Sequence, residues 1–225
     1  MTHMTTVTSG DEAAALLTCV RNRPQKMSIH DVVSHVLDAG SAVAAWANMK
    51  GEAPTLFGDD PFAGAREEIR SWNSSWVSLL DKGYPARLRS VHDAPPFLFY
   101  RGSLEAVQRG GMSIVGTRRL SPAGEQRARD AAAYLAELRI PIISGLAAGI
   151  DAIAHDTALS QGGVPVGVIA TPIAGPYTPA PNRDLHEKVA QSGVLISQFF
   201  PNDPVAKRNF IQRNATMSGL GEDRK

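Results

Sequence analysis

Two glycine-bearing turns, each placed directly after a short apolar run, constrain the fold of this 225-residue chain more than any other feature. The apolar run Met112–Val115 stops at Gly116, and the run Ile140–Ile143 leads into the turn Ser144–Gly149. Between the runs, apolar residues recur at the spacing of one helix face, behind a serine and a proline typical of a helix start. A strand, a helix and a second strand predict a parallel pair with both turns at its carboxyl edge, where open α/β sheets bind ligands.

The same alternation of strands and helices continues along the chain. Pro-rich segments precede a buried strand at Phe97–Tyr100, and further strands are expected near Val164–Ala170 and Val194–Gln198. Helical patterns follow these strands, at Ile150–Ser160, Asn182–Gln191 and Lys207–Leu220. We therefore expect an α/β fold with a mostly parallel, Rossmann-like sheet.

The first third of the chain is predicted to be helical. Helices are expected at Asp11–Val20, Ser28–Met49 and Ala65–Leu80, with a loop at Pro54–Gly64. All three tryptophans fall in this part, where an aromatic core is a better interpretation than a base-stacking surface. We expect a small helical domain over residues 1–80, with flexible first residues, and a Rossmann-like domain over residues 81–225.

Composition excludes several classes of protein. Hydrophobic residues make up 43% of the chain and charged residues 20%, which is typical of a globular domain with a real core. The formal net charge is only +1, so a site for a polyanion must come from local placement of charge. A single cysteine excludes an internal disulfide framework, and neither a membrane span nor a signal peptide is present. We expect a cytoplasmic protein without a membrane partner.

The turn Gly116–Arg119 has the composition of an anion-binding site. It lies where a strand gives way to a helix N-terminus, so backbone N–H groups and the helix dipole would face a ligand there. Gly116 lets a phosphate approach closely, while Arg118 and Arg119, beside Thr117, add charge-assisted contacts. Taken alone, the motif also fits a tight turn with solvated arginines. It lacks G-x-G-x-x-G, which disfavours a nicotinamide cofactor.

The second turn contributes Ser144, Gly145, Gly149 and Asp151, the last of which suits a helix N-terminus. Ser144, His155 and Asp151 could form a nucleophilic triad, but no nucleophile-elbow motif accompanies them, and a cap with a polar pair is favoured. The other histidines show no metal-ligand spacing. We therefore expect no catalytic residue, no metal and no cofactor.

Basic residues also gather at two later helix starts. Arg183 follows the Pro-rich turn, with a helix cap and a surface arginine as the alternative interpretation. The last helix adds Lys207, Arg208, Asn209, Phe210, Arg213 and Asn214, for which a solvated helix is the alternative. Because these segments share one sheet edge, together they predict a groove that follows a phosphate backbone, with Phe210 or Tyr177 available for base stacking.

Several longer motifs, in the same order, resemble the bacterial DNA-processing protein A family, also called DprA or Smf. They include W-x-x-L-L-D-x-G-Y-P from Trp76 and S-I-V-G-T-R-R-x-S-P-x-G from Ser113. Further matches are I-S-G-L-A-x-G-I-D-x-x-A-H from Ile143 and N-F-x-x-R-N from Asn209. The resemblance covers roughly Trp76–Leu220, and the N-terminal part looks like that family's small helical domain.

The resemblance implies an extended Rossmann-like domain that binds single-stranded DNA and dimerises. It also implies a role in natural transformation and DNA recombination, in which the strand is handed to the recombinase RecA without catalysis. Carried over by position, Gly116–Arg119, Ser144–Asp151 and Lys207–Asn214 would form the phosphate-binding pocket.

The chain departs from this family at several positions. Ala148 stands where the family usually has an arginine, Gln198 where it has a glutamate, and Gln212–Ala215 where it has R-R-N-R. The chain also ends soon after Leu220, so it is expected to be shortened at its C-terminus. Fewer cations should weaken phosphate affinity. Two alternatives therefore stay open: a nucleotide-binding sensor that uses the same pocket, and a degenerate partner subunit of a full-length relative.

Overall fold

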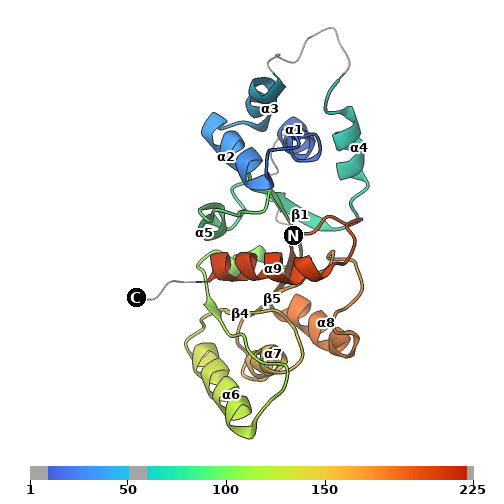
Figure 1. Cartoon of the computed structure of the whole chain (residues 1–225). Coiled ribbons are helices and arrows are strands. Elements are labelled where there is room, and N and C mark those ends of the chain that lie inside the picture. Colours follow the sequence, from blue (N-terminus) through green and yellow to red (C-terminus); the bar gives the residue numbers. More distant parts are fainter. Residues whose placement is uncertain (1–9, 51–59, 222–225) are drawn as a thin grey trace.

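A computed structural model describes residues 10–50 and 60–221 of the chain. Figure 1 shows a helical unit at one end of the molecule and a sheet with its own helices at the other. The helices of the N-terminal unit are α1 (Gly10–Arg21), α2 (Ile29–Ala39), α3 (Ala42–Lys50) and α4 (Ala63–Arg70).

Local signals explain where α2 begins and ends. Ser28 and Asp31 form a capping box, in which each side chain accepts a hydrogen bond from the other residue's backbone N–H. Gly40 ends the helix with a left-handed φ of 66°, a conformation that favours glycine. The predicted helix Ser28–Met49 is therefore two helices, α2 and α3.

A six-stranded sheet in the order β1-β2-β6-β5-β4-β3 forms the centre of the second part. Strands β3 to β6 are parallel, and β1 and β2 run antiparallel to their neighbours. The prediction of an α/β fold with a mostly parallel sheet is confirmed. The strands are β1 (Ser75–Ser78), β2 (Phe97–Gly102), β3 (Met112–Ser113), β4 (Ile142–Ser144), β5 (Pro165–Val168) and β6 (Val194–Ser197).

Helices cover both faces of this sheet. Since β3, β4, β5 and β6 are added in one direction, right-handed crossovers place the three connecting helices on one face. Figure 1 shows α9 on the opposite side of the strands from α6 and α7. The crossover helices are α6 (Pro122–Glu137), α7 (Ile150–Ser160) and α8 (Arg183–Ser192), and the last helix is α9 (Lys207–Leu220). Shorter helices are α5 (Ala86–Arg89), η1 (Leu104–Val107) and η2 (Ala180–Asn182).

The predicted helix Ala65–Leu80 is wrong in its second half. Helix α4 ends at Arg70, and residues from Ser75 form β1, in which Trp76 pairs with Phe99 of β2. Helical spacing of the tryptophans was misleading because their partners lie on the sheet. The predicted loop Pro54–Gly64 is also too long, because α4 begins at Ala63, although residues 54–59 lie outside the described part. The sheet thus begins before the expected domain boundary at residue 81.

An aromatic cluster joins the helical unit to the sheet. The ring of Trp72 lies 5.3 Å from that of Phe97, 5.0 Å from that of Phe99 and 5.8 Å from that of Phe200. The guanidinium of Arg21, at the end of α1, lies 4.3 Å from the centre of the Phe200 ring. These contacts bury large apolar surfaces between the two parts. None of the helices within residues 10–50 and 60–221 combines the length and apolarity needed to cross a membrane.

Candidate nucleic-acid interface

The two glycine turns lie together at the carboxyl ends of β3 and β4. The backbone N–H of Ile150 donates to the carbonyl of Thr117 at 3.2 Å, which links the second turn to the first. Gly149 has a φ of +90°, and a Cβ there would lie 2.3 Å from the Thr117 oxygen. A Cβ on Gly116 would in turn meet the side chain of Ile150 at 2.7 Å. Both glycines are therefore required for the close approach of the two turns.

Asp151, at the start of α7, is hydrogen-bonded to both turns. Its buried carboxylate accepts hydrogen bonds from the N–H groups of Gly116 at 3.4 Å and of Gly145 at 3.1 Å. Burial raises the pKa of this carboxyl group, whereas the charge of Arg213 and the backbone N–H donors lower it. The sequence predicted that N–H groups of the first turn face a ligand. The N–H of Gly116 instead faces Asp151, so this prediction is wrong for that amide.

Arg213 of α9 places a buried positive charge beside Gly145 of the second turn. Its Nη1 donates to the carbonyl of Val168, at the end of β5, at 3.2 Å. The guanidinium lies directly against Gly145, where a Cβ would be 1.3 Å from Nη1. Burial lowers the pKa of Arg213 and the charge of Asp151 opposes that effect. Arg213 and Asp151 therefore form the charged interior of the site rather than its accessible surface.

Two other predicted site residues are also internal. The Ser144 hydroxyl donates to the carbonyl of Ile114 at 2.5 Å, and the Asn209 amide donates to the carbonyl of Pro204 at 3.3 Å. Within the described residues, the ring nitrogens of the buried His155 have no hydrogen-bond partner. The alternative of a Ser144–His155–Asp151 triad is therefore wrong, because the Ser144 hydroxyl donates to Ile114 and the Asp151 carboxylate accepts from Gly116 and Gly145, so neither side chain is bonded to His155.

Exposed cations lie on three segments that border this interior. They are Arg118 and Arg119 on the first turn, Arg183 at the start of α8, and Lys207 and Arg208 at the start of α9. Arg118 lies near enough to Arg213 to lower its pKa. The amide of Asn182 donates to the carbonyl of Leu146 at 2.9 Å and so ties the start of α8 to the second turn. The sequence left a helix cap open here as the alternative to a functional role, and the Asn182 side chain makes no capping hydrogen bond.

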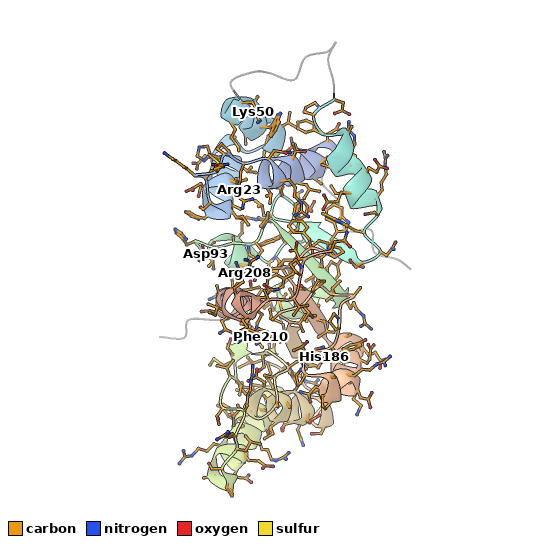
Figure 2. All side chains as sticks on the ribbon, turned by 45° about the vertical axis from the view of Figure 1, so that its right-hand side comes forward. Arg23, Lys50, Asp93, His186, Arg208 and Phe210 are labelled. Carbon is orange, nitrogen blue, oxygen red and sulfur yellow. The ribbon has the colours of Figure 1, made fainter. Side chains whose placement is uncertain are left out.

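The exposed residues of α9 point in two directions. The carbonyl of Met217 accepts a hydrogen bond from the Ser113 hydroxyl of β3 at 3.5 Å, and Phe210 and Asn214 lie on the same side of α9 as Met217. A Cβ on Gly219 would meet Leu88 of α5 at 2.7 Å. Arg208 lies on that second side, and Figure 2 shows Arg208 and Phe210 on opposite sides of the helix. Phe210 and Asn214 thus share a side of α9 with Met217, whereas Arg208 lies on the side that packs against α5.

Sequence reasoning missed a network beside the start of α8. Arg101 of β2 donates from Nη1 to Glu187 at 3.1 Å and from Nη2 at 2.5 Å, and the Tyr177 hydroxyl donates to the same carboxylate. The hydrogen bonds from Arg101, then that from Tyr177, lower the pKa of Glu187 to about 2. The Arg183 guanidinium lies 5.4 Å from the centre of the Tyr177 ring. Tyr177 is thus held beside Arg183, and no local sequence signal linked β2 to α8.

The burial of His155 gives the protein a defined pH dependence. Burial lowers the pKa of His155 to about 4, whereas an unfolded histidine titrates near 6.5. The unfolded chain therefore binds a proton first, and the free energy of unfolding should fall by up to roughly 3 kcal/mol as the pH drops from about 6.5 to about 4. Denaturant unfolding at several pH values measures this slope. Burial also lowers the pKa of His186 to about 4, so this residue adds to the slope. His155→Leu and His186→Leu should therefore each remove about half of the slope above pH 5.

A comparison with known families matches residues 75–223 to the profile described as DNA recombination-mediator protein A. The DNA processing protein DprA of Streptococcus pneumoniae is 35% identical over 143 residues, which are 64% of this chain and 50% of that protein. The protein Smf of Synechocystis is 34% identical over 158 residues, which are 68% of this chain and 39% of that protein. The chain spans about half the length, or less, of these curated relatives.

Solved structures agree with the sequence comparisons. The X-ray structure of DprA from Streptococcus pneumoniae superimposes with a TM-score of 0.73 at 26% identity, covering 96% of this chain and 76% of that one. DNA processing protein A from Helicobacter pylori, described with a unique single-stranded DNA binding mode, superimposes with a TM-score of 0.57 at 25% identity. That match covers 66% of this chain and 67% of the other.

Proposed function

Because this chain belongs to the DNA recombination-mediator protein A family, we propose that it binds single-stranded DNA at the carboxyl edge of its sheet, without catalysing a reaction. One observation carries the proposal. Exposed cations lie on the first turn and at the starts of α8 and α9, and the buried Asp151 and Arg213 join the two glycine turns, the end of β5 and α9 to one another. Such an arrangement suits a flexible polyanion better than a small substrate.

The backbone of the bound strand would contact cations rather than amides. The N–H groups of Gly116 and Gly145 already serve Asp151, which leaves Arg118, Arg119, Arg183 and Lys207 for the phosphates. Binding should therefore be largely independent of base sequence and sensitive to salt.

Base stacking is proposed for Phe210. It is half-buried and lies on the same side of α9 as Met217, whose carbonyl accepts a hydrogen bond from Ser113 of β3. An aromatic ring beside a line of cations is the usual means of holding a base without reading its identity. Tyr177 has less freedom for this role, because its hydroxyl is bonded to Glu187 and Arg183 lies close to its ring.

We also propose the wider role that the family description suggests. A recombination mediator delivers single strands to a recombinase, so we expect RecA as a partner and DNA uptake in the cytoplasm as the setting. A homodimer, or a complex with a full-length relative, is proposed as the assembly. Pull-down of purified RecA by the DNA-bound chain, and light scattering for the assembly, test these two points.

Loss of one exposed cation should weaken binding without unfolding the protein. Arg118→Ala and Lys207→Ala should each reduce affinity for a labelled single-stranded oligonucleotide by about three- to tenfold at low salt, because each removes a phosphate contact. Arg70→Ala is the matched control, since it removes an exposed arginine from α4, in the helical unit. Fluorescence anisotropy titrations with oligonucleotide and with duplex of the same sequence measure the effect.

Two outcomes of this titration would contradict the proposal. Equal affinities for all four proteins would remove the carboxyl edge from the binding site. Absence of oligonucleotide binding, together with tight retention of a mononucleotide, would instead favour the nucleotide sensor.

A further inference from the structure

A pocket of about 580 Å³ lies beside the Pro-rich turn that follows β5. It is lined by residues 73–75 at the start of β1, residues 100–102 at the end of β2, and residues 173–175 and Tyr177 of the turn. Asn73, Ser75 and Ala174 are exposed, so the pocket is open to solvent. Pockets of about 300 to 1,000 Å³ commonly hold small organic molecules. Because the lining segments are far apart in the chain, sequence spacing does not reveal this pocket.

The lining of the pocket is polar but carries little net charge. Among the described residues, Arg101 is the one charged residue that lines it, and its two Nη atoms donate to Glu187 of α8 at 3.1 and 2.5 Å. This bidentate pair leaves little charge for an anion. The other polar groups are neutral, and the buried Ser74 hydroxyl makes no hydrogen bond within the described residues. A neutral ligand with polar edges therefore fits the pocket better than a phosphate.

The Tyr177 ring forms a fixed wall of the pocket. Its hydroxyl donates to Glu187, and its ring centre lies 5.3 Å from that of His186, which Figure 2 labels on α8. A wall that is already held loses little freedom when a ligand binds. The exposed guanidinium of Arg183 lies 5.4 Å from the centre of the same ring. A phosphate bound by Arg183 would therefore belong to a nucleotide whose base can reach the pocket.

We propose that this pocket accepts one nucleobase of the bound strand, while Arg183 contacts the phosphate of the same nucleotide. The inference rests on the proposed DNA-binding function and adds to it a base site, separate from the stacking on Phe210. The base would lie against the Tyr177 ring and place its polar edge toward Asn73 and the Ser74 hydroxyl. Since the contact involves no phosphate, it should add affinity without adding salt dependence.

Two substitutions in the pocket test the proposal by anisotropy titration with a single-stranded oligonucleotide. Ala174 is exposed, so Ala174→Trp should fill the pocket without disturbing the fold, and it should weaken binding about five- to tenfold. Asn73→Ala removes a polar partner of the base and should weaken binding about two- to fivefold. Both variants should keep the wild-type slope of log affinity against log salt. Asn22→Ala, at an exposed asparagine of the helical unit, is the control and should bind as the wild type does.

A strand of the same length without bases supplies the second measurement. It keeps the phosphates, so the wild type and Ala174→Trp should bind it equally, whereas the strand with bases should distinguish them. Circular dichroism shows whether each variant is folded. Wild-type affinity of both pocket variants for the strand with bases, or an equal loss on both strands, would overturn the proposal. If Arg118→Ala still weakens binding in that case, only the base site is excluded, whereas a wild-type chain that binds neither strand would exclude the DNA-binding function as well.

Discussion

Replacing Asp151 with asparagine is expected to lower the free energy of unfolding by about 3 kcal/mol. The substitution keeps the shape of the side chain but removes its charge, which leaves the buried Arg213 without its opposing charge. One of the two N–H donors, on Gly116 or Gly145, also loses its acceptor, because an amide group offers one oxygen where the carboxylate offers two. Urea denaturation of the purified variant measures the loss.

Asp156→Asn provides the control for this experiment. Asp156 lies on the same helix, α7, but is exposed, so its change should stay within about 0.5 kcal/mol of the wild type. The Asp151 variant should also lose most of its affinity for single-stranded DNA, because the two turns would no longer be fixed. Equal stability of the two variants would show that the Asp151–Arg213 pair does not organise the site.

Gly149→Ala is expected to cost about 3 kcal/mol or more. Gly149 has a φ of +90°, which strains any residue with a Cβ, and that Cβ would lie 2.3 Å from the backbone oxygen of Thr117. The obstacle is backbone rather than the end of a flexible side chain, so the first turn itself must move. Both the thermal midpoint and DNA binding should fall together.

Gly162→Ala measures the cost of a positive φ alone, without a clash between the added Cβ and a neighbouring residue. Gly162 also has a positive φ, of +64°, but nothing lies within 4 Å of the position of its Cβ. It should therefore lose only about 1 kcal/mol and keep wild-type DNA binding. If Gly149→Ala behaves like Gly162→Ala, the close approach of the two turns contributes little to the site.

Much of the fold could be predicted because its signals are local. The Ser121–Pro122 helix start, the apolar runs of β4 to β6 and the capping box at Ser28 depend on neighbours in the chain. Strand β1 could not be predicted in this way. Trp72 and Trp76 have helical spacing, and only their contacts with the aromatic residues of β2 turn the second tryptophan into a strand residue.

The candidate site was likewise predictable only in part. The sequence placed the glycine turns and the basic residues on one sheet edge, because the carboxyl ends of parallel strands share that edge. It did not separate exposed cations such as Arg118 from the buried Arg213, since the position of an arginine in a turn or a helix does not show which side chain the fold buries. The buried role of Asp151 and the turning of Arg208 toward α5 depend on how α9 packs across the sheet.

The central claim is that a single strand lies along the cations at the carboxyl edge. Its most direct test is the slope of log affinity against log salt for a single-stranded oligonucleotide. Arg118→Ala should make this slope shallower by about 0.7, the value for one phosphate contact on a single strand, and Arg118→Ala combined with Lys207→Ala by about twice that. Arg70→Ala should keep the wild-type slope. Identical slopes for all of these proteins would contradict the account.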